Sequence, residues 1–134
     1  MASKKVSKSS LEEISIRGLG VIESTNIEFK PGLTVLTGET GAGKTMVLTA
    51  LGLVLGSKSD SDLVRQGQER AVITGKFAVP KDIADLIVES GGEVEDESVV
   101  ITRTLSTAGK SRVLVGGAVS STSAVNQFSQ SLVE

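Results

Sequence analysis

The residues from Gly38 to Thr45 have the types and the spacing of a phosphate-binding loop. They read Gly38-Glu39-Thr40-Gly41-Ala42-Gly43-Lys44-Thr45 and satisfy the pattern G-x-x-x-x-G-K-[ST] in full. Glycines let the backbone curl so that successive N–H groups point at a phosphate, and the following helix N-terminus adds partial positive charge. The sequence therefore predicts that all eight residues hold the phosphates of a nucleotide.

Two side chains of this loop are predicted to carry its chemistry. The Lys44 ammonium would reach the β- and γ-phosphates, which gives it a catalytic role, and the Thr45 hydroxyl would bind Mg²⁺. A nucleotide and Mg²⁺ are therefore the predicted ligands of the loop.

The flanking sequence predicts the elements that position this loop. Residues 33–37 form a short, apolar, β-branched run that is typical of a buried strand, and residues 43–55 have a helical pattern. This helix is apolar on nearly every side, so we expect it to be enclosed between two layers, and Gly56 is its expected C-cap. Strand, loop and helix follow in the order that the motif requires.

The rest of the chain alternates in the manner of an antiparallel sheet. Two strands joined by a bend at residues 18–20 are expected before the loop, and three strands are expected at residues 71–79, 99–105 and 112–115. Residues 81–90 are predicted to form a short amphipathic helix, and residues 121–134 to begin another. Residues 57–68 are expected to form a polar loop, and residues 91–97 an acidic, solvated one.

Two stretches are similar to catalytic motifs but lack the flanking sequence that those motifs require. Gly109-Lys110-Ser111 resembles the end of a second phosphate loop, but Thr104 stands where its first glycine is required, so a hairpin turn is predicted. Glu89 follows an apolar run as a metal-binding carboxylate would, yet the spacing of that run is helical.

Composition excludes several kinds of chemistry. The 134 residues contain no cysteine and no histidine, which rules out zinc–thiolate sites, disulfides and histidine acid–base catalysis. The net charge of −2 gives no basic footprint for nucleic acid. Residues 1–10 are predicted to be a flexible basic tail, and because no apolar run is long enough to span a membrane, we expect an intracellular, soluble protein.

The order of the predicted elements indicates the class of nucleotide-binding protein. The chain has no N-K-x-D sequence, which argues against a GTPase. Two antiparallel strands precede the loop, and further long strands follow its helix. This arrangement is similar to the N-terminal lobe of an ABC-type ATPase head. The predicted fold class is therefore α/β, with mixed or antiparallel β layers packed around the helix that follows the phosphate loop.

Four stretches resemble RecN, a family of bacterial SMC-like ATPases of DNA double-strand-break repair. They are residues 14–22, 29–45, 63–67 and 101–112, and the resemblance extends over about residues 11–134. It implies a head that binds ATP and Mg²⁺ and forms a homodimer with a second head, the nucleotide lying between them. It also implies a place for Arg65 near the γ-phosphate and for Arg17 near the nucleotide.

The same resemblance implies parts that these residues do not contain. The family's signature motif, catalytic carboxylates, glutamine loop and coiled coil are not found in residues 11–134, which are predicted to be an N-terminal lobe that ends before the glutamine loop. The implied partners are the C-terminal half of the same head and, through the full-length protein, DNA, in the cytoplasm with the nucleoid and away from any membrane. We expect no ATP hydrolysis by the 134 residues alone.

Two other functions remain open at this point. One is a small P-loop kinase, and the other is a non-catalytic assembly module in which ATP only joins protomers.

Overall fold

The structure is a computed structural model that describes residues 11–28, 41–58 and 60–133, with only the backbone described for residues 41–44 and 128–133. The predicted tail at residues 1–10, the predicted strand at residues 33–37, and Gly38, Glu39 and Thr40 lie outside the described residues.

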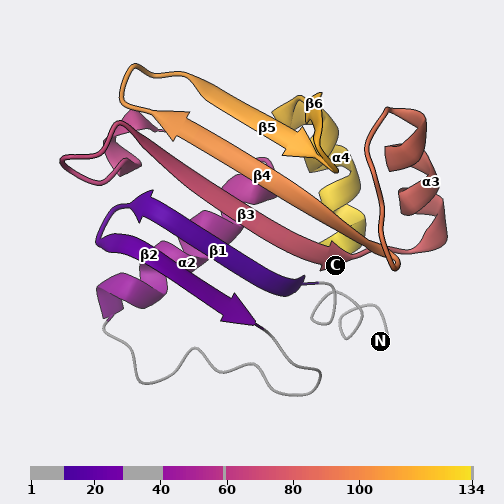
Figure 1. The fold of residues 1–134 in the computed structure, drawn as a ribbon, viewed down its shortest axis with the longest axis horizontal. Coiled ribbons are helices and arrows are strands. Elements are labelled where there is room, and N and C mark those ends of the chain that lie inside the picture. Colours follow the sequence, from indigo (N-terminus) through magenta and orange to yellow (C-terminus); the bar gives the residue numbers. More distant parts are fainter. Residues whose placement is uncertain (1–10, 29–40, 59, 134) are drawn as a thin grey trace.

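Within the described residues, six strands form one sheet in the spatial order β2-β1-β3-β4-β5-β6, and every neighbouring pair is antiparallel (Figure 1). Their bounds are β1 Leu11–Leu19, β2 Ile22–Glu28, β3 Arg70–Ala78, β4 Ser98–Ser106, β5 Ser111–Val115 and β6 Ala118–Ser120. The register places Ile16 opposite Ile73, and Ile73 opposite Arg103. The predicted antiparallel layer is therefore confirmed.

Helices lie on one face and at one end of this sheet. Helix α2 (Gly41–Val54) and helix α4 (Thr122–Val133) lie behind the strands in Figure 1, and α3 (Lys81–Glu89) lies beyond the end where β3 leaves the sheet. A short 3₁₀ turn, η1 (Ser61–Leu63), follows α2. No helix in the described ranges combines the length and the apolar composition needed to cross a bilayer.

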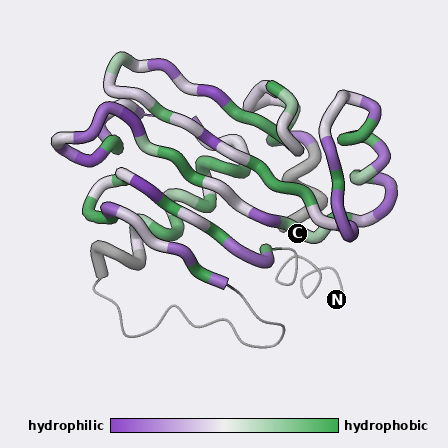
Figure 2. Tube along the Cα trace, viewed as in Figure 1, coloured by the Kyte–Doolittle hydropathy of each residue, from purple (hydrophilic) through white to green (hydrophobic). Residues whose placement is uncertain are grey.

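The core fills the space between the sheet and α2, because alternate strand residues point toward the helix. The buried side chains include Ile16, Ile73 and Ile101 from the strands and Leu53 and Val54 from α2. Figure 2 shows this apolar character along the central strands and along α2. Burying each large aliphatic side chain contributes about 1.5–3 kcal/mol to the stability of the fold.

A glycine in β3 makes room for the ring of Phe77. A Cβ built at Gly75 would lie 2.7 Å from the Phe77 ring and 3.4 Å from Cγ2 of Val54 in α2. The first distance is too short for any real contact, whereas the second is an ordinary van der Waals contact. The observed position of the Phe77 ring therefore depends on glycine at residue 75.

Three local features differ from the sequence expectations. The predicted polar loop at residues 57–68 contains η1 and a β-bridge between Leu19 and Val64. The acidic segment is not wholly solvated, because Gly92 is buried and the Glu93 N–H donates to the Gly116 carbonyl at 2.9 Å. Strand β6 was not predicted, since three residues are too few to show an alternating pattern.

Both stretches that are similar to catalytic motifs have the predicted structures. Residues 107–110 form the turn of the β4–β5 hairpin, and Glu89 is the last residue of α3.

Candidate nucleotide-binding site

Helix α2 begins inside the phosphate-loop motif. Its first residue is Gly41, so Gly41, Ala42, Gly43 and Lys44 form the first helical turn, and the Thr45 side chain that follows is exposed. The first N–H groups of a helix have no acceptor within it and give its N-terminus a partial positive charge. No acidic residue lies in this first turn to compensate that charge. The start of α2 is thus chemically suited to an anion such as phosphate.

The β1–β2 turn fixes the start of α2 against the sheet. Met46 lies next to Gly20, whose φ of +55° is in the left-handed region, and a Cβ built on Gly20 would overlap Sδ of Met46. Both the backbone angle and the space therefore require glycine at this position. The turn and the first part of the helix are in direct contact as a result.

Arg65 lies at the same turn. Its backbone N–H donates to the Gly18 carbonyl at 2.7 Å, and its Nη1 donates to the Gly20 carbonyl at 3.2 Å. The Gly20 N–H in turn donates to the Leu63 carbonyl at 2.8 Å. Arg65 and Met46 thus contact the same residue, Gly20, which brings the half-buried arginine toward the start of α2.

Arg17 has a different position. It is exposed in β1 and pairs with Val72, while its neighbour Ile16 is buried on the side that α2 covers. Because successive strand side chains point to opposite faces, Arg17 points away from α2. Of the two predicted arginines, the structure brings Arg65 toward the helix start and does not bring Arg17 there.

The other end of α2 is tied to the sheet by Arg103, a residue whose role was not predicted. Arg103 is only 1% exposed. Its Nη1 donates to the carbonyls of Leu53 at 2.7 Å and Ser57 at 2.9 Å, and its Nε donates to Oγ of Ser111 at 2.9 Å. Burial lowers the pKa of the Arg103 guanidinium from its usual value. The negative end of the helix dipole faces this buried cation and stabilises it.

A second contact closes the same helix end. Gly56 has a φ of +102°, which confirms it as the C-cap, and its carbonyl accepts a hydrogen bond from Nδ2 of Asn126 in α4 at 3.2 Å. A Cβ on Gly56 would lie 2.7 Å from Oδ1 of Asn126. Helix α4 therefore packs against the end of α2.

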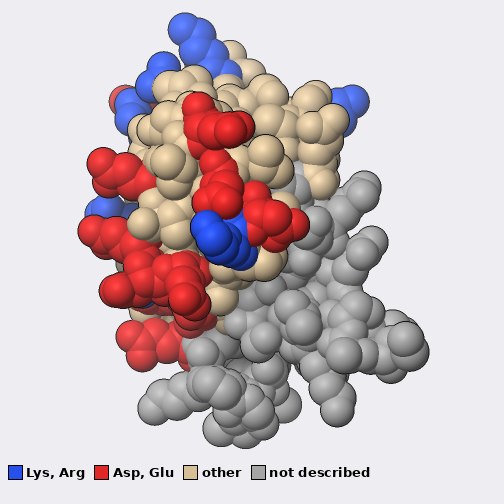
Figure 3. Space-filling view, turned by 90° about the vertical axis from the view of Figure 1, so that its right-hand side faces the viewer, with Lys and Arg blue, Asp and Glu red and all other residues tan. Residues whose placement is uncertain are grey.

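Carboxylates gather at the α3 end of the molecule, away from the start of α2 (Figures 1 and 3). They come from α3 and from the segment that follows it, and include Asp82, Asp85, Glu89, Glu93, Glu95, Asp96 and Glu97. The one ion pair among the described residues joins Nζ of Lys81 to Asp85 at 3.4 Å, with both side chains exposed. Within the described ranges no three acidic residues are close enough to hold a metal ion.

The family model of the AAA domain matches residues 13–132. The chain belongs to the AAA domain family. The predicted α/β P-loop fold is confirmed by this match and by the observed sheet and helices.

Two curated relatives make the similarity of this AAA domain more specific. The chain is 51% identical to the DNA repair protein RecN of Streptomyces coelicolor over 104 residues, covering 76% of the chain and 18% of the relative. It is 36% identical to RecN of Bacillus subtilis over 126 residues, covering 92% of the chain and 22% of the relative. The predicted resemblance to RecN is confirmed, and the chain spans about a fifth of the length of these relatives.

The fold of this AAA domain is shared with an SMC head. The Smc head domain of Pyrococcus furiosus, solved with an extended coiled coil, superimposes with a TM-score of 0.72 at 21% identity. The match covers 93% of this chain and 34% of that one.

Proposed function

We propose that this AAA domain is an ATP- and Mg²⁺-binding part of the ATPase head of a RecN-type DNA repair protein. The observation that supports it most is that α2 begins at Gly41, inside the complete phosphate-loop motif, so that its first N–H groups are available to phosphate. The RecN relatives supply the DNA repair context.

The loop and its flanking arginines have separate roles in this proposal. Gly38 to Thr45 would hold the phosphates, and the exposed Thr45 hydroxyl would hold Mg²⁺, a cation that prefers oxygen ligands and would offset phosphate charge. Arg65 neutralises charge that develops on the γ-phosphate. Its contact with the Gly20 carbonyl supports this role. For Arg17 the proposed nucleotide contact rests on the family resemblance alone.

The outer side of α2 supports the presence of further parts of a head. From Thr45 to Val54 the helix carries no charged residue, and Leu48 is 56% exposed on the side away from the sheet. An apolar helix surface of this kind is suited to burial. We propose that the C-terminal half of the same head covers it, that a second head closes over the nucleotide, and that DNA binds through the full-length protein, in the cytoplasm with the nucleoid.

Nucleotide binding tests the proposal directly. We expect the chain to bind ATP in the presence of Mg²⁺, as measured by isothermal titration, and Lys44→Ala to weaken binding at least a hundredfold, because two charge-assisted contacts are lost. Lys110→Ala is the matched control, since Lys110 also stands between glycine and a hydroxyl residue but lies in a hairpin turn. Equal affinity of the two variants would refute the site.

A second experiment tests whether the 134 residues alone hydrolyse ATP. Steady-state release of phosphate from ATP should stay at the uncatalysed level for the 134 residues alone. Turnover by these residues that disappears in Lys44→Ala would show that the catalytic base lies within them, and would favour a self-contained enzyme over part of a head.

A further inference from the structure

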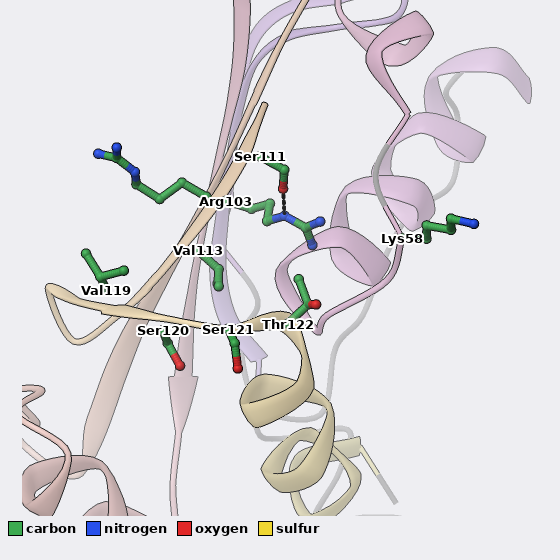
Figure 4. Close-up of a pocket in the computed structure, with 9 residues that line it drawn as sticks. Lys58, Arg103, Ser111, Val113, Val119, Ser120, Ser121 and Thr122 are labelled. Atoms are coloured by element: carbon green, nitrogen blue, oxygen red, sulfur yellow. Dashed lines mark hydrogen bonds between the residues drawn. The ribbon is translucent and has the colours of Figure 1, made fainter. Parts of the chain in front are cut away.

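A cavity of about 470 Å³ lies at the edge of the sheet, between β5, β6, the start of α4 and the segment after α2 (Figure 4). Among the described residues its lining is rich in hydroxyl groups and cations and contains no carboxylate: Lys58, Arg103, Ser111, Arg112, Val113, Val119, Ser120, Ser121 and Thr122.

Arg103 offers this cavity two N–H groups that no described residue accepts. A guanidinium has five N–H donors, and the three on Nε and Nη1 go to Ser111, Leu53 and Ser57. The Nη2 nitrogen donates to none of the residues that the structure describes. Every solvent-excluded side-chain nitrogen and oxygen in the described part of the chain has a partner, so Nη2 is not sealed off from solvent. It therefore faces the cavity that Arg103 lines.

The start of α4 provides further donors on the same wall. Oγ of Ser121 accepts from the Ala124 N–H at 3.1 Å and caps the helix, which leaves its own O–H free to donate. Thr122 is the first helical residue, and Figure 4 shows it on the same side of the strands as Arg103 and Ser111. The hydroxyls of Thr122 and Ser111 and the partial positive charge of a 12-residue helix thus border the space beside the guanidinium.

The other two cationic residues, Lys58 and Arg112, do not direct their charge into the cavity. Figure 4 shows the Lys58 side chain pointing away from Arg103. Arg112 is exposed, and its neighbour Val113 is buried toward the helices, so the Arg112 side chain lies on the opposite face of the sheet. The charge that faces into the cavity is therefore that of Arg103, together with the α4 N-terminus.

We propose that this cavity binds a phosphoryl oxyanion, with Nη2 of Arg103, the Thr122 hydroxyl and the first N–H groups of α4 as donors. A tetrahedral oxyanion can accept from both N–H groups of Nη2 and from the helix start together. The site is separate from the phosphate loop, since the 14 residues of α2 place its two ends about 20 Å apart. Anion binding in this cavity therefore does not require a nucleotide at the phosphate loop.

Inorganic phosphate is the probe, and Lys44→Ala is the background, because it removes phosphate binding at the loop. At constant ionic strength we expect saturable shifts in the amide resonances of Thr122 and Ser123 and in the Nε–H resonance of Arg103. Thr122→Val should weaken this binding about tenfold, since a donor to an anion is lost. The matched control is Thr104→Val, which makes the same isosteric change on the face of β4 opposite Arg103.

Two outcomes would overturn the proposal: no saturable shift at these resonances, or equal phosphate affinity in Thr122→Val and Thr104→Val. A variant that replaces Arg103 is not needed, so the test does not depend on the folding of such a variant. A 5′-phosphorylated dinucleotide and its unphosphorylated form identify the source. Binding of the phosphorylated form alone shows that the cavity takes a terminal phosphate of a nucleic acid, and binding of inorganic phosphate alone shows a site for the free anion.

Discussion

The two ends of α2 carry opposite partial charges and have different surroundings. At its start, no acidic residue of the first turn offsets the partial positive charge, and the described contacts there include the Met46–Gly20 packing and the arginine at the same turn. At its end, partial negative charge is met inside the protein by the buried Arg103. One end is therefore available to an anion from solution, whereas the other is anchored to β4.

This difference predicts that stability and nucleotide binding respond to different substitutions along one helix. Changes at the anchored end should lower the free energy of unfolding and leave nucleotide affinity unchanged. Changes in the loop side chains should weaken nucleotide binding and leave the free energy of unfolding unchanged.

The largest expected effect is that of Arg103→Met. It leaves three oxygen acceptors without their donor, and we expect the free energy of unfolding to fall by about 3 kcal/mol in urea titrations. Arg112→Met, at an exposed position of the neighbouring strand, should change it by less than about 0.5 kcal/mol. A loss below about 1 kcal/mol for Arg103→Met would mean that α2 is not anchored by this residue.

The next effect is that of Gly20→Ala, at the contact near the start of the helix. The new Cβ meets Met46 and a positive φ is imposed on alanine, so we expect a loss of about 2 kcal/mol in the free energy of unfolding. Gly67→Ala is the matched control. Gly67 also has a positive φ, of +90°, but no atom lies within 4 Å of the added Cβ. Equal losses in the two variants would show that the contact with Met46 contributes nothing.

Thr45→Val should act on binding rather than on stability. Removing the hydroxyl proposed to bind Mg²⁺ should weaken ATP binding about tenfold in the presence of Mg²⁺ and much less in its absence, which titration with and without EDTA would measure. Thr49→Val, one turn further along α2, is the control. If both variants weaken ATP binding equally, the Thr45 hydroxyl has no special role.

The smallest expected effect is that of Asn126→Ala. The hydrogen bond from α4 to the Gly56 carbonyl is lost, and we expect the free energy of unfolding to fall by about 1 kcal/mol, with nucleotide affinity unchanged. Gln127→Ala, at the exposed adjacent position of α4, should have almost no effect. A change in ATP affinity in Asn126→Ala would show that the two ends of α2 are coupled.

Residue patterns predicted the parts of this molecule that depend on local periodicity. The alternation of Ile14 and Ile16 predicted β1, and the helical spacing of Ile83 and Ile87 predicted α3, because each pattern marks one buried face. The phosphate loop, predicted from its motif, stays a prediction, because Gly38, Glu39 and Thr40 lie outside the described residues. Strand β6 was missed because its pairing with β5, and not its own sequence, defines it.

The alternation of buried residues along β4 contained a signal for the position of Arg103. It is in phase with Ile101 and Leu105, both of which are buried, so the pattern already placed an arginine on the core side of β4. The acceptors were not predictable in the same way, since Leu53 and Ser57 are some fifty residues earlier in the chain. Only the packing of α2 on the sheet brings them to the guanidinium.

The uncharged outer side of α2 has a consequence for biosynthesis. The RecN relatives are about five times as long as the stretch that this chain matches, and ribosomes add ~5–20 residues per second. If later segments cover Leu48 and its neighbours, this surface is exposed on the nascent polypeptide for tens of seconds. During that interval its apolar side chains can associate with other exposed apolar surfaces, which makes this stage of synthesis prone to aggregation.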